Sequence, residues 1–551
     1  MVPDATLVRA GLILTATGIV SAATVRYAID PGTGDGIFGL GFVLYLALLL
    51  VAASGHQRPF ARPLAFVSFA AIYVTGTLPT NANDLGLGLY IAAGALAYLA
   101  TPVRFRVFTV AALALWTPAF RLFGPDPLGG SFPLSLAVAC VLSLFFLVAV
   151  LLAGDTLDDD ERLRRIGLGL LAVACVARIA ERHLVVASRG VAAPDDVWAL
   201  VVLAALPVLA VLPARRLIRD ALATGVALGA YLLSSVVLLV GKGYHVDSVV
   251  VVHRATQILL AGGNPYRDLD VTEAITHFGL DPALATHFVD GSPLHNYNYP
   301  ALSFLIPAPF VALGVEDIRY LYLAEILILV LVLLRKARVP WRPLIAAAIV
   351  GNSVIARQNV LAGVDPFWAI ATLFAFVFIR WRWWSPVLMG LAIAARQPAW
   401  FFAPFYVLAV WKRSGRRAAA RSVGISAIVA ILPNLPFFIL APGAWIDGIT
   451  QPLLAALEPY GVGLVRFAMD GFIPLLPRGV YAALSLGCMA AFLVLLARRW
   501  RGFPTGVLVF PTVVLWFAWR SLQNYFSFAA IFALIGDETI GHDDPVTETP
   551  A

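Results

Sequence analysis

The chain has 551 residues, of which 60% are apolar and only 13% are charged. Apolar runs of roughly 20 residues, the length that crosses the hydrocarbon core of a bilayer, recur from end to end. This pattern predicts an all-α, polytopic integral membrane protein and excludes a β-barrel, whose strands would show short alternating segments. The net charge of +7 does not indicate a nucleic-acid partner. The basic residues of the chain cluster in short loops of the kind that stay on the cytoplasmic side of a membrane.

Residues 1–215 form the first predicted module. They contain about eight apolar runs and no motif that carries recognisable chemistry. We interpret the first run as an uncleaved helix rather than a signal peptide, because many further runs follow it. The module is therefore predicted to be an accessory transmembrane unit.

Residues 216–536 form the second predicted module, and 537–551 a disordered acidic tail. The apolar run 221–240 follows a basic loop, so its start is expected on the cytoplasmic side. Its far end then opens into a polar extracytoplasmic loop, residues 244–299. Further spans are expected near 301–315, 317–334, 343–356, 360–379, 386–411, 422–440, 479–497, 504–519 and 522–536. Several contain Pro or Gln, which is typical of broken helices that line a cavity.

The loop begins with the segment 248–261, SVVVVHRATQILLA. It has an apolar face opposite His253, Arg254 and Gln257, which predicts a helix lying in the membrane interface. Asp247 precedes it, where the helix dipole favours an ionised carboxylate. Asp247 is either a plain helix cap or a reactive carboxylate.

The end of this helix and the end of the loop carry polar and aromatic residues. Asn264 and Tyr266 lie in a tight Gly-Gly-Asn-Pro-Tyr turn, and Tyr297, Asn298 and Tyr299 open the next span. Tyrosines at this depth are either an ordinary aromatic belt or sugar-binding residues.

Five of the eight histidines lie between residues 245 and 295 and raise the question of a metal. They form no HExxH motif and no closely spaced triad, and His245-x-Asp247 is the only tight pair. We expect no metal cofactor, with a divalent ion as the alternative. His245 is more simply a group that hydrogen-bonds substrate or assists proton transfer.

In this order the motifs resemble the GT-C membrane glycosyltransferases, and most closely family 87, the polyprenyl-phosphate-mannose-dependent mannosyltransferases. The similar segments are Asp247 with GGNPY, YNYPALSFLIPAP, ARQNVLAGVDPFWA, GLAIAARQPAWFFAPF and WRSLQNYFSF, and they cover about residues 221–536. Three departures are Tyr-Pro-Ala in place of Tyr-Pro-Pro, Arg357 in place of Gly, and Arg396 in place of Lys. The N-terminal module is extra.

The resemblance implies a GT-C-like helical bundle in the plasma membrane, with its active site on the extracytoplasmic face. It implies transfer of mannose or another hexose or pentose from a polyprenyl phosphate to a hydroxyl of a glycolipid or polysaccharide. The mechanism would be inverting and metal-free. Asp247 would be the general base, assisted by His245. Donor phosphate would meet Arg396, Arg357, Arg520, Gln358 and Gln397. Substrate would contact Tyr266, Asn264, Tyr297, Asn298, Tyr299, His253 and Arg254.

Other interpretations stay open. Each arginine is also explained as a cation that snorkels to the membrane surface, although Arg357 and Arg396 lie mid-run, where that route is longer. A transporter or lipid-linked-sugar flippase would also have broken helices and intramembrane arginines. It would not require a polar loop of this size after one helix. A structural membrane subunit would explain residues 1–215 but not the loop.

Overall fold

The computed structural model describes residues 216–535 apart from short gaps, together with Leu168 and Leu171. The gaps are residues 241–242, 351–354, 356–358, 361–362, 462, 470–472, 501–505, 529–530 and 533–534. The rest of the predicted N-terminal module, the acidic tail, Arg357 and Gln358 lie outside the described residues.

The chain divides into two compact units. One contains Met1–Ser234, Leu333–Ser353 and Val462–Asp470, and the other contains Ser235–Val332, Val354–Gly461 and Gly471–Ala551. The boundary falls inside α9 (Arg216–Val240), within the module predicted to start at residue 216. Other elements of the first unit are the end of α15 (Arg319–Lys336), η3 (Val339–Trp341), α16 (Arg342–Val350) and α22 (Leu464–Met469). All the loop and cluster residues discussed below belong to the second unit.

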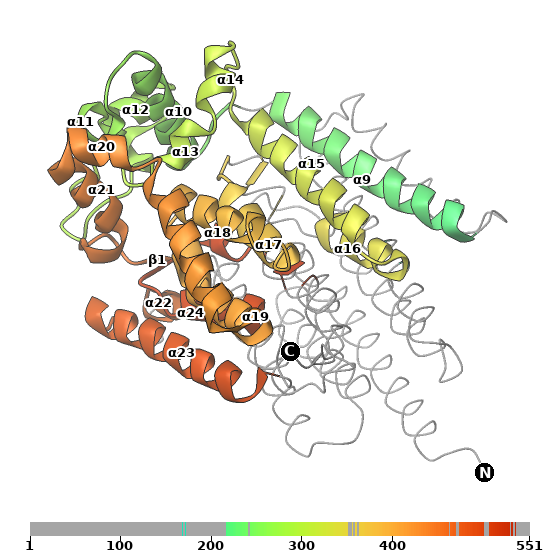
Figure 1. The fold of residues 1–551 in the computed structure, drawn as a ribbon. Coiled ribbons are helices and arrows are strands. Elements are labelled where there is room, and N and C mark those ends of the chain that lie inside the picture. The colour runs from blue at the N-terminus through green and yellow to red at the C-terminus, as the bar shows by residue number, and fades with distance from the viewer. Residues whose placement is uncertain are drawn as a thin grey trace, which may run out of the picture. The chain divides into compact units, whose positions relative to one another are not determined.

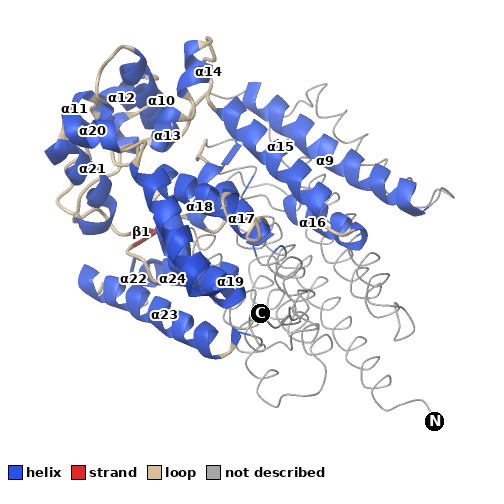
Figure 2. Cartoon of the chain, in the orientation of Figure 1, coloured by secondary structure: helices blue, strands red, loops and turns tan. Residues whose placement is uncertain are grey.

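The described part of the chain is mostly helical, as predicted, and Figure 2 shows very little strand. The strands are β1 (Tyr460–Gly461) and β2 (Arg520–Ser521), which pair in parallel. Among the described residues, Arg478–Arg498 is the one helix long and apolar enough to cross a membrane. Several shorter apolar helices, such as Phe367–Val377 and Trp384–Ala395, accompany it.

The loop and the segment that follows it form a cap of short helices, which Figure 1 shows gathered together. Its members are α10 (Asp247–Leu260), α11 (Pro265–Asp268), α12 (Val271–His277), η2 (Pro282–Leu284), α13 (Leu302–Leu305) and α14 (Ala308–Ala312). Two helices from later in the chain, α20 (Leu435–Leu440) and α21 (Pro442–Leu454), complete it. α10 confirms the helix predicted over 248–261.

The apolar face of α10 is buried in protein rather than left open to a membrane. Val249 to Val252 are at most 3% exposed and share a core with Tyr266, Tyr297 and Phe304. The backbone at Gly363, which has a left-handed φ of +75°, passes against Val249 so closely that a Cβ there would clash with it. α12, α13 and α14 pack against α10, so its apolar side contacts protein. The placement of this helix in the membrane interface stays a prediction.

The other helices of this unit form a bundle: α17 (Phe367–Val377), α18 (Trp384–Ala395), α19 (Pro398–Ile431), α23 (Arg478–Arg498) and α24 (Gly506–Trp516). The first part of α19 packs antiparallel along α18, to which Arg396 and Gln397 join it. The chain turns at Gly415, which has a left-handed φ of +83°, and the second part of α19 runs back beside α18, where Ser426 Oγ donates to the Pro386 carbonyl at 2.8 Å. Arg396 has extended backbone (φ −153°, ψ 145°). Pro398 has no N–H with which to continue α18 and begins α19 instead.

Some of the predicted spans coincide with single helices of the structure, and others are divided between two helices. α15, α16, α23 and α24 lie where spans were expected, and α17 covers the second half of 360–379. The span 386–411 is instead two helices. The segment 301–315 is interrupted at Pro307, and 422–440 is split between the end of α19 and α20. Nothing in the sequence analysis anticipated α21 or the β1–β2 pair.

Candidate functional site

Asp247 is the first residue of α10, following the N-cap residue Val246, and no side-chain capping bond is made. Its half-buried carboxylate accepts a hydrogen bond from Thr286 Oγ1 at 3.2 Å. This placement does not support the interpretation of Asp247 as a plain helix cap. Burial raises the pKa of Asp247, against the lowering effects of the Thr286 hydroxyl, the Ser248 amide and the charges of Arg520 and Arg396. The sequence predicted that the helix terminus would keep this carboxylate ionised. In the structure, burial has a larger effect on its pKa than the helix terminus does.

Arg520 is held beside this carboxylate by the short strand pair. Tyr460 is opposite Arg520 in the β1–β2 register, and Arg520 Nη1 donates to the Glu458 carbonyl at 3.0 Å. Arg520 Nη2 then lies 3.5 Å from Thr286 Oγ1, the hydroxyl that donates to Asp247. Thr286 thus lies between the carboxylate and the guanidinium.

Thr286 itself is positioned by the segment that carries β1. The Glu458 N–H donates to the His287 carbonyl at 2.9 Å, and the Val289 N–H donates to the Ala456 carbonyl at 2.8 Å. The Leu294 N–H closes the turn by donating to the Thr286 carbonyl at 2.7 Å. Residues 456–458 therefore hold both the 286–289 segment and Arg520. The sequence analysis missed Thr286, because no local motif distinguishes a threonine whose partner is 39 residues earlier.

Arg396 approaches the same place from the turn between α18 and α19. Its guanidinium carbon lies 3.7 Å from the centroid of the Tyr299 ring, a cation–π contact. The residue is 6% exposed, and its Nε forms a buried ion pair with Asp365 Oδ2 at 3.6 Å, a distance beyond hydrogen-bond range. Arg396 Nε and Nη2 are both buried without a hydrogen-bond partner. A buried guanidinium with unused donors is suited to an anion.

The Tyr299 backbone is fixed by two residues that were predicted to bind phosphate or substrate. Gln397 Nε2 donates to the Asn298 carbonyl at 2.7 Å, and the Tyr266 hydroxyl donates to the Tyr299 carbonyl at 2.8 Å. Gln397 and Tyr266 thereby orient Tyr299 over Arg396. Tyr299 also interacts electrostatically with Asp247. We call Asp247, Thr286, Tyr299, Arg396 and Arg520 the carboxylate–arginine cluster.

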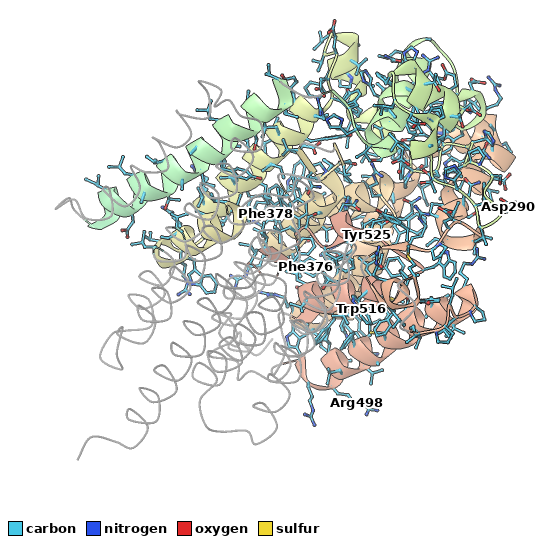
Figure 3. All side chains as sticks on the ribbon, turned by 180° about the vertical axis from the view of Figure 1, so that it is seen from behind. Asp290, Phe376, Phe378, Arg498, Trp516 and Tyr525 are labelled. Atoms are coloured by element: carbon cyan, nitrogen blue, oxygen red, sulfur yellow. The ribbon has the colours of Figure 1, made fainter. Side chains whose placement is uncertain are left out.

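Tyr525, labelled in Figure 3, adds a half-buried phenol to this cluster that the sequence analysis did not select. Its hydroxyl interacts electrostatically with Tyr299, Arg520 and Arg396. It lies in the WRSLQNYFSF segment five residues after Arg520, so the signal was present in the sequence. Asp365 was also missed, although it lies in the AGVDPF stretch.

Other predicted site residues have structural contacts and lie apart from the cluster. His253 is 3% exposed, packs on Phe278 and hydrogen-bonds the Tyr244 hydroxyl at 2.9 Å. Burial lowers the pKa of His253 to about 4, so the ring is neutral at physiological pH. Arg254 forms a 3.0 Å ion pair with Glu273.

Two further predicted residues are also structural. Asn264 caps α11 by accepting from the Tyr266 N–H at 3.1 Å. The fully buried Tyr297 hydroxyl bonds Ser303 at 2.6 Å. We include none of these four residues in the cluster. His245 is exposed, two residues before Asp247.

Within the described part of the chain, no group of three or more His, Cys, Asp or Glu side chains could hold a metal ion. The tightest pair of this kind in the loop is His295 with Asp270, at 2.7 Å. The absence of a metal cofactor stays a prediction.

These features define the chain as a mostly helical protein with a half-buried carboxylate, Asp247, in one cluster with two arginines and two tyrosines. Searches for similarity to known proteins found no matching family model, no matching curated protein and no matching solved structure. The cluster itself is therefore the basis for assigning a function.

Proposed function

We propose that the protein is a membrane glycosyltransferase that moves a sugar from a polyprenyl phosphate to a hydroxyl group of a glycan acceptor. The single observation that carries this proposal is the half-buried Asp247 carboxylate, which Thr286 joins to Arg520, in one cluster with the buried Arg396. Transfer from a lipid phosphate needs a base on one side of the anomeric carbon and cations on the other. The resemblance of the surrounding motifs to the GT-C enzymes supports the same assignment.

In the proposed reaction, Asp247 accepts the proton of the acceptor hydroxyl as its oxygen attacks the anomeric carbon. A new carbon–oxygen bond forms as the bond from the anomeric carbon to the phosphate oxygen breaks, with inversion. The electron pair leaves with the lipid phosphate. Burial raises the pKa of Asp247, which makes its carboxylate a better proton acceptor than that of an exposed aspartate.

The leaving phosphate would be stabilised by the arginines. Arg396 offers Nε and Nη2, which have no hydrogen-bond partner. Arg520 offers a guanidinium already fixed by the Glu458 carbonyl. Charge-assisted bonds to phosphate in a site with little water are strong, and they strengthen as charge develops on the leaving oxygen.

We also propose that the protein is a multi-pass plasma-membrane protein with the cluster on its extracytoplasmic face. A cysteine in place of the exposed Ser292 should then react with a membrane-impermeant thiol reagent in intact cells. A cysteine at the exposed Ser414, beyond the far end of the bundle, should react only after permeabilisation. Ser422 is unsuitable for this comparison because it is 3% exposed. The reverse labelling pattern would invert the orientation.

The function is tested by incubating the purified protein with radiolabelled polyprenyl-phosphate sugars and a lipid extract as acceptor. We expect wild type to move label into a product that lacks the donor phosphate. Asp247→Asn should form this product more slowly than wild type. A flippase, the alternative, would move the labelled donor between leaflets of a vesicle without breaking the sugar–phosphate bond. Translocation without transfer would contradict the proposal.

A further inference from the structure

A second charged feature lies at the opposite end of the helical bundle from the carboxylate–arginine cluster. α17 starts two residues after Asp365 and ends three residues before Arg380. α18 starts at Trp384 and ends immediately before Arg396. Both helices therefore run between the two ends, and the turns at the far end carry Arg380, Trp381, Arg382 and Trp383.

Three segments far apart in the sequence meet at that end. The Arg421 guanidinium carbon lies 5.5 Å from the Trp383 ring, which joins α19 to the turn before α18. Lys412 Nζ donates to the Ala497 carbonyl at 2.7 Å, which joins α19 to the end of α23. Arg498 extends outwards from that end of α23 (Figure 3). We call residues 380–384, 411–421 and 498–499 the basic–aromatic end.

The aromatic side chains of this end are open rather than packed in a core. Trp381, Trp383 and Trp384 are 51%, 58% and 64% exposed, and Trp411 is 39% exposed. Lys412 and Arg416 lie over Trp411, at 5.4 and 5.7 Å from the ring. Amphipathic tryptophans that carry cations on their faces are typical of the headgroup layer of a bilayer.

The positive charge of this end is not compensated along the chain. The segments contribute nine cations, Arg380, Arg382, Lys412, Arg413, Arg416, Arg417, Arg421, Arg498 and Arg499, and no Asp or Glu occurs from residue 366 to residue 446. Burial and the neighbouring charge of Arg380 lower the pKa of Arg413, so like charges are held close together. Arg421 Nε is buried without a hydrogen bond. A cluster of nine cations attracts anions.

We propose that the basic–aromatic end binds the headgroups of anionic phospholipids in the membrane leaflet opposite the carboxylate–arginine cluster. The tryptophans enter the headgroup layer, and the cations pair with the lipid phosphates. Juxtamembrane basic residues gain roughly 1 kcal/mol each from an anionic leaflet, so the effect is expected to be cumulative. The inference rests on the proposed membrane placement but not on the transferase activity, because it uses none of the cluster residues.

The test uses detergent-purified full-length protein titrated with short-chain phosphatidylglycerol, with binding followed by tryptophan fluorescence and by native mass spectrometry. Wild type is expected to bind phosphatidylglycerol much more tightly than phosphatidylcholine. Arg380→Gln/Arg382→Gln should weaken phosphatidylglycerol binding roughly 30-fold for two lost charges. The matched control, Arg254→Gln/Arg267→Gln, removes two arginines from the loop cap and should bind as wild type does.

Equal phosphatidylglycerol affinity in the Arg380/Arg382 variant and wild type would overturn the proposal. So would equal binding of the two lipids by wild type, or tighter binding of the soluble polyanion inositol hexakisphosphate than of phosphatidylglycerol. Melting temperature without lipid checks folding. If the arginine variant melts early, Trp381→Ala/Trp384→Ala, which keeps every charge, must still show reduced lipid binding.

Discussion

The central carbon of the Arg396 guanidinium lies 3.7 Å from the centroid of the Tyr299 ring. Burial raises the pKa of the Tyr299 phenol and the nearby Asp247 charge raises it further, so this tyrosine is close to both the proposed phosphate ligand and the proposed base. Neither contact is local in the sequence. The geometry of the cluster therefore depends on how the turn at Arg396 and Gln397 meets the end of the loop.

Arg396→Ala should weaken binding of the polyprenyl-phosphate donor by about 1.5–3 kcal/mol, the usual size of a hydrogen bond to a charged group. Arg396→Lys should recover part of this loss, because lysine restores the charge but not the planar pair of donors. The measurement is a donor titration of purified protein. Arg254→Ala, which breaks an ion pair with Glu273 and a 3.4 Å hydrogen bond to Gln257, is the control and should change donor affinity little. Unchanged donor affinity in Arg396→Ala would remove this residue from the site.

Gln397→Ala should impair transfer although Gln397 does not touch the proposed reacting atoms. The substitution leaves the Asn298 carbonyl without its 2.7 Å donor and frees the loop that carries Tyr299. An unsatisfied group of this kind costs about 1–3 kcal/mol. We expect a lower melting temperature together with a raised KM for donor. Gln257→Ala on α10 serves as the comparison, and an equal effect in both variants would show that Gln397 has no special positioning role.

Gly461→Ala should displace Arg520. Gly461 has φ +143°, and an added Cβ would collide with the Ser521 carbonyl across the β1–β2 pair. The strained backbone alone costs about 1–3 kcal/mol. Loss of stability and of transfer are both expected. Gly479→Ala, at a helical position with nothing within 4 Å of the new methyl, should leave the melting temperature equal or higher. A neutral Gly461→Ala would mean that the strand pair does not position Arg520.

Thr286→Val should move the acidic limb of the kcat/KM profile to higher pH. Burial raises the pKa of Asp247, and the Thr286 hydroxyl opposes that rise, so its removal raises the pKa further. Thr286→Ser keeps the hydroxyl and should retain the wild-type limb. A limb that stays in place in Thr286→Val would contradict the proposed contact between this hydroxyl and the base.

The same pKa has a consequence for stability. Because the folded-state pKa of Asp247 lies above the unfolded value, the folded protein holds its proton more tightly. The contribution of this group to stability is therefore present below the ordinary aspartate pKa and is lost as pH rises through the folded pKa. Asp247→Asn should be free of this loss, so its melting temperature relative to wild type should increase across that window.

Some of this architecture follows from local sequence. The helix of 247–260 follows from its apolar periodicity, and the break before Pro398 follows from a proline that cannot continue α18. The hydrogen bond from Thr286 to Asp247 and the anchoring of Arg520 by Glu458 do not follow, because their partners are 39 and 62 residues apart. A two-residue strand pair has too little periodicity to be recognised. In a chain this apolar, the pattern of apolar residues also does not show that α21 is a separate helix. It likewise does not show whether the apolar face of α10 contacts protein or lipid.

The most direct test of the proposed function is sugar transfer by purified Asp247→Asn beside wild type, with melting temperatures measured in parallel. Asparagine keeps the size of the side chain and can still accept from Thr286, so the fold should survive. It cannot take the acceptor proton, and loss of a general base typically lowers the rate by about 10²–10⁴. We predict a folded protein with donor affinity near that of wild type and transfer reduced by that factor. Near-normal transfer by Asp247→Asn would contradict the assignment of Asp247 as the base.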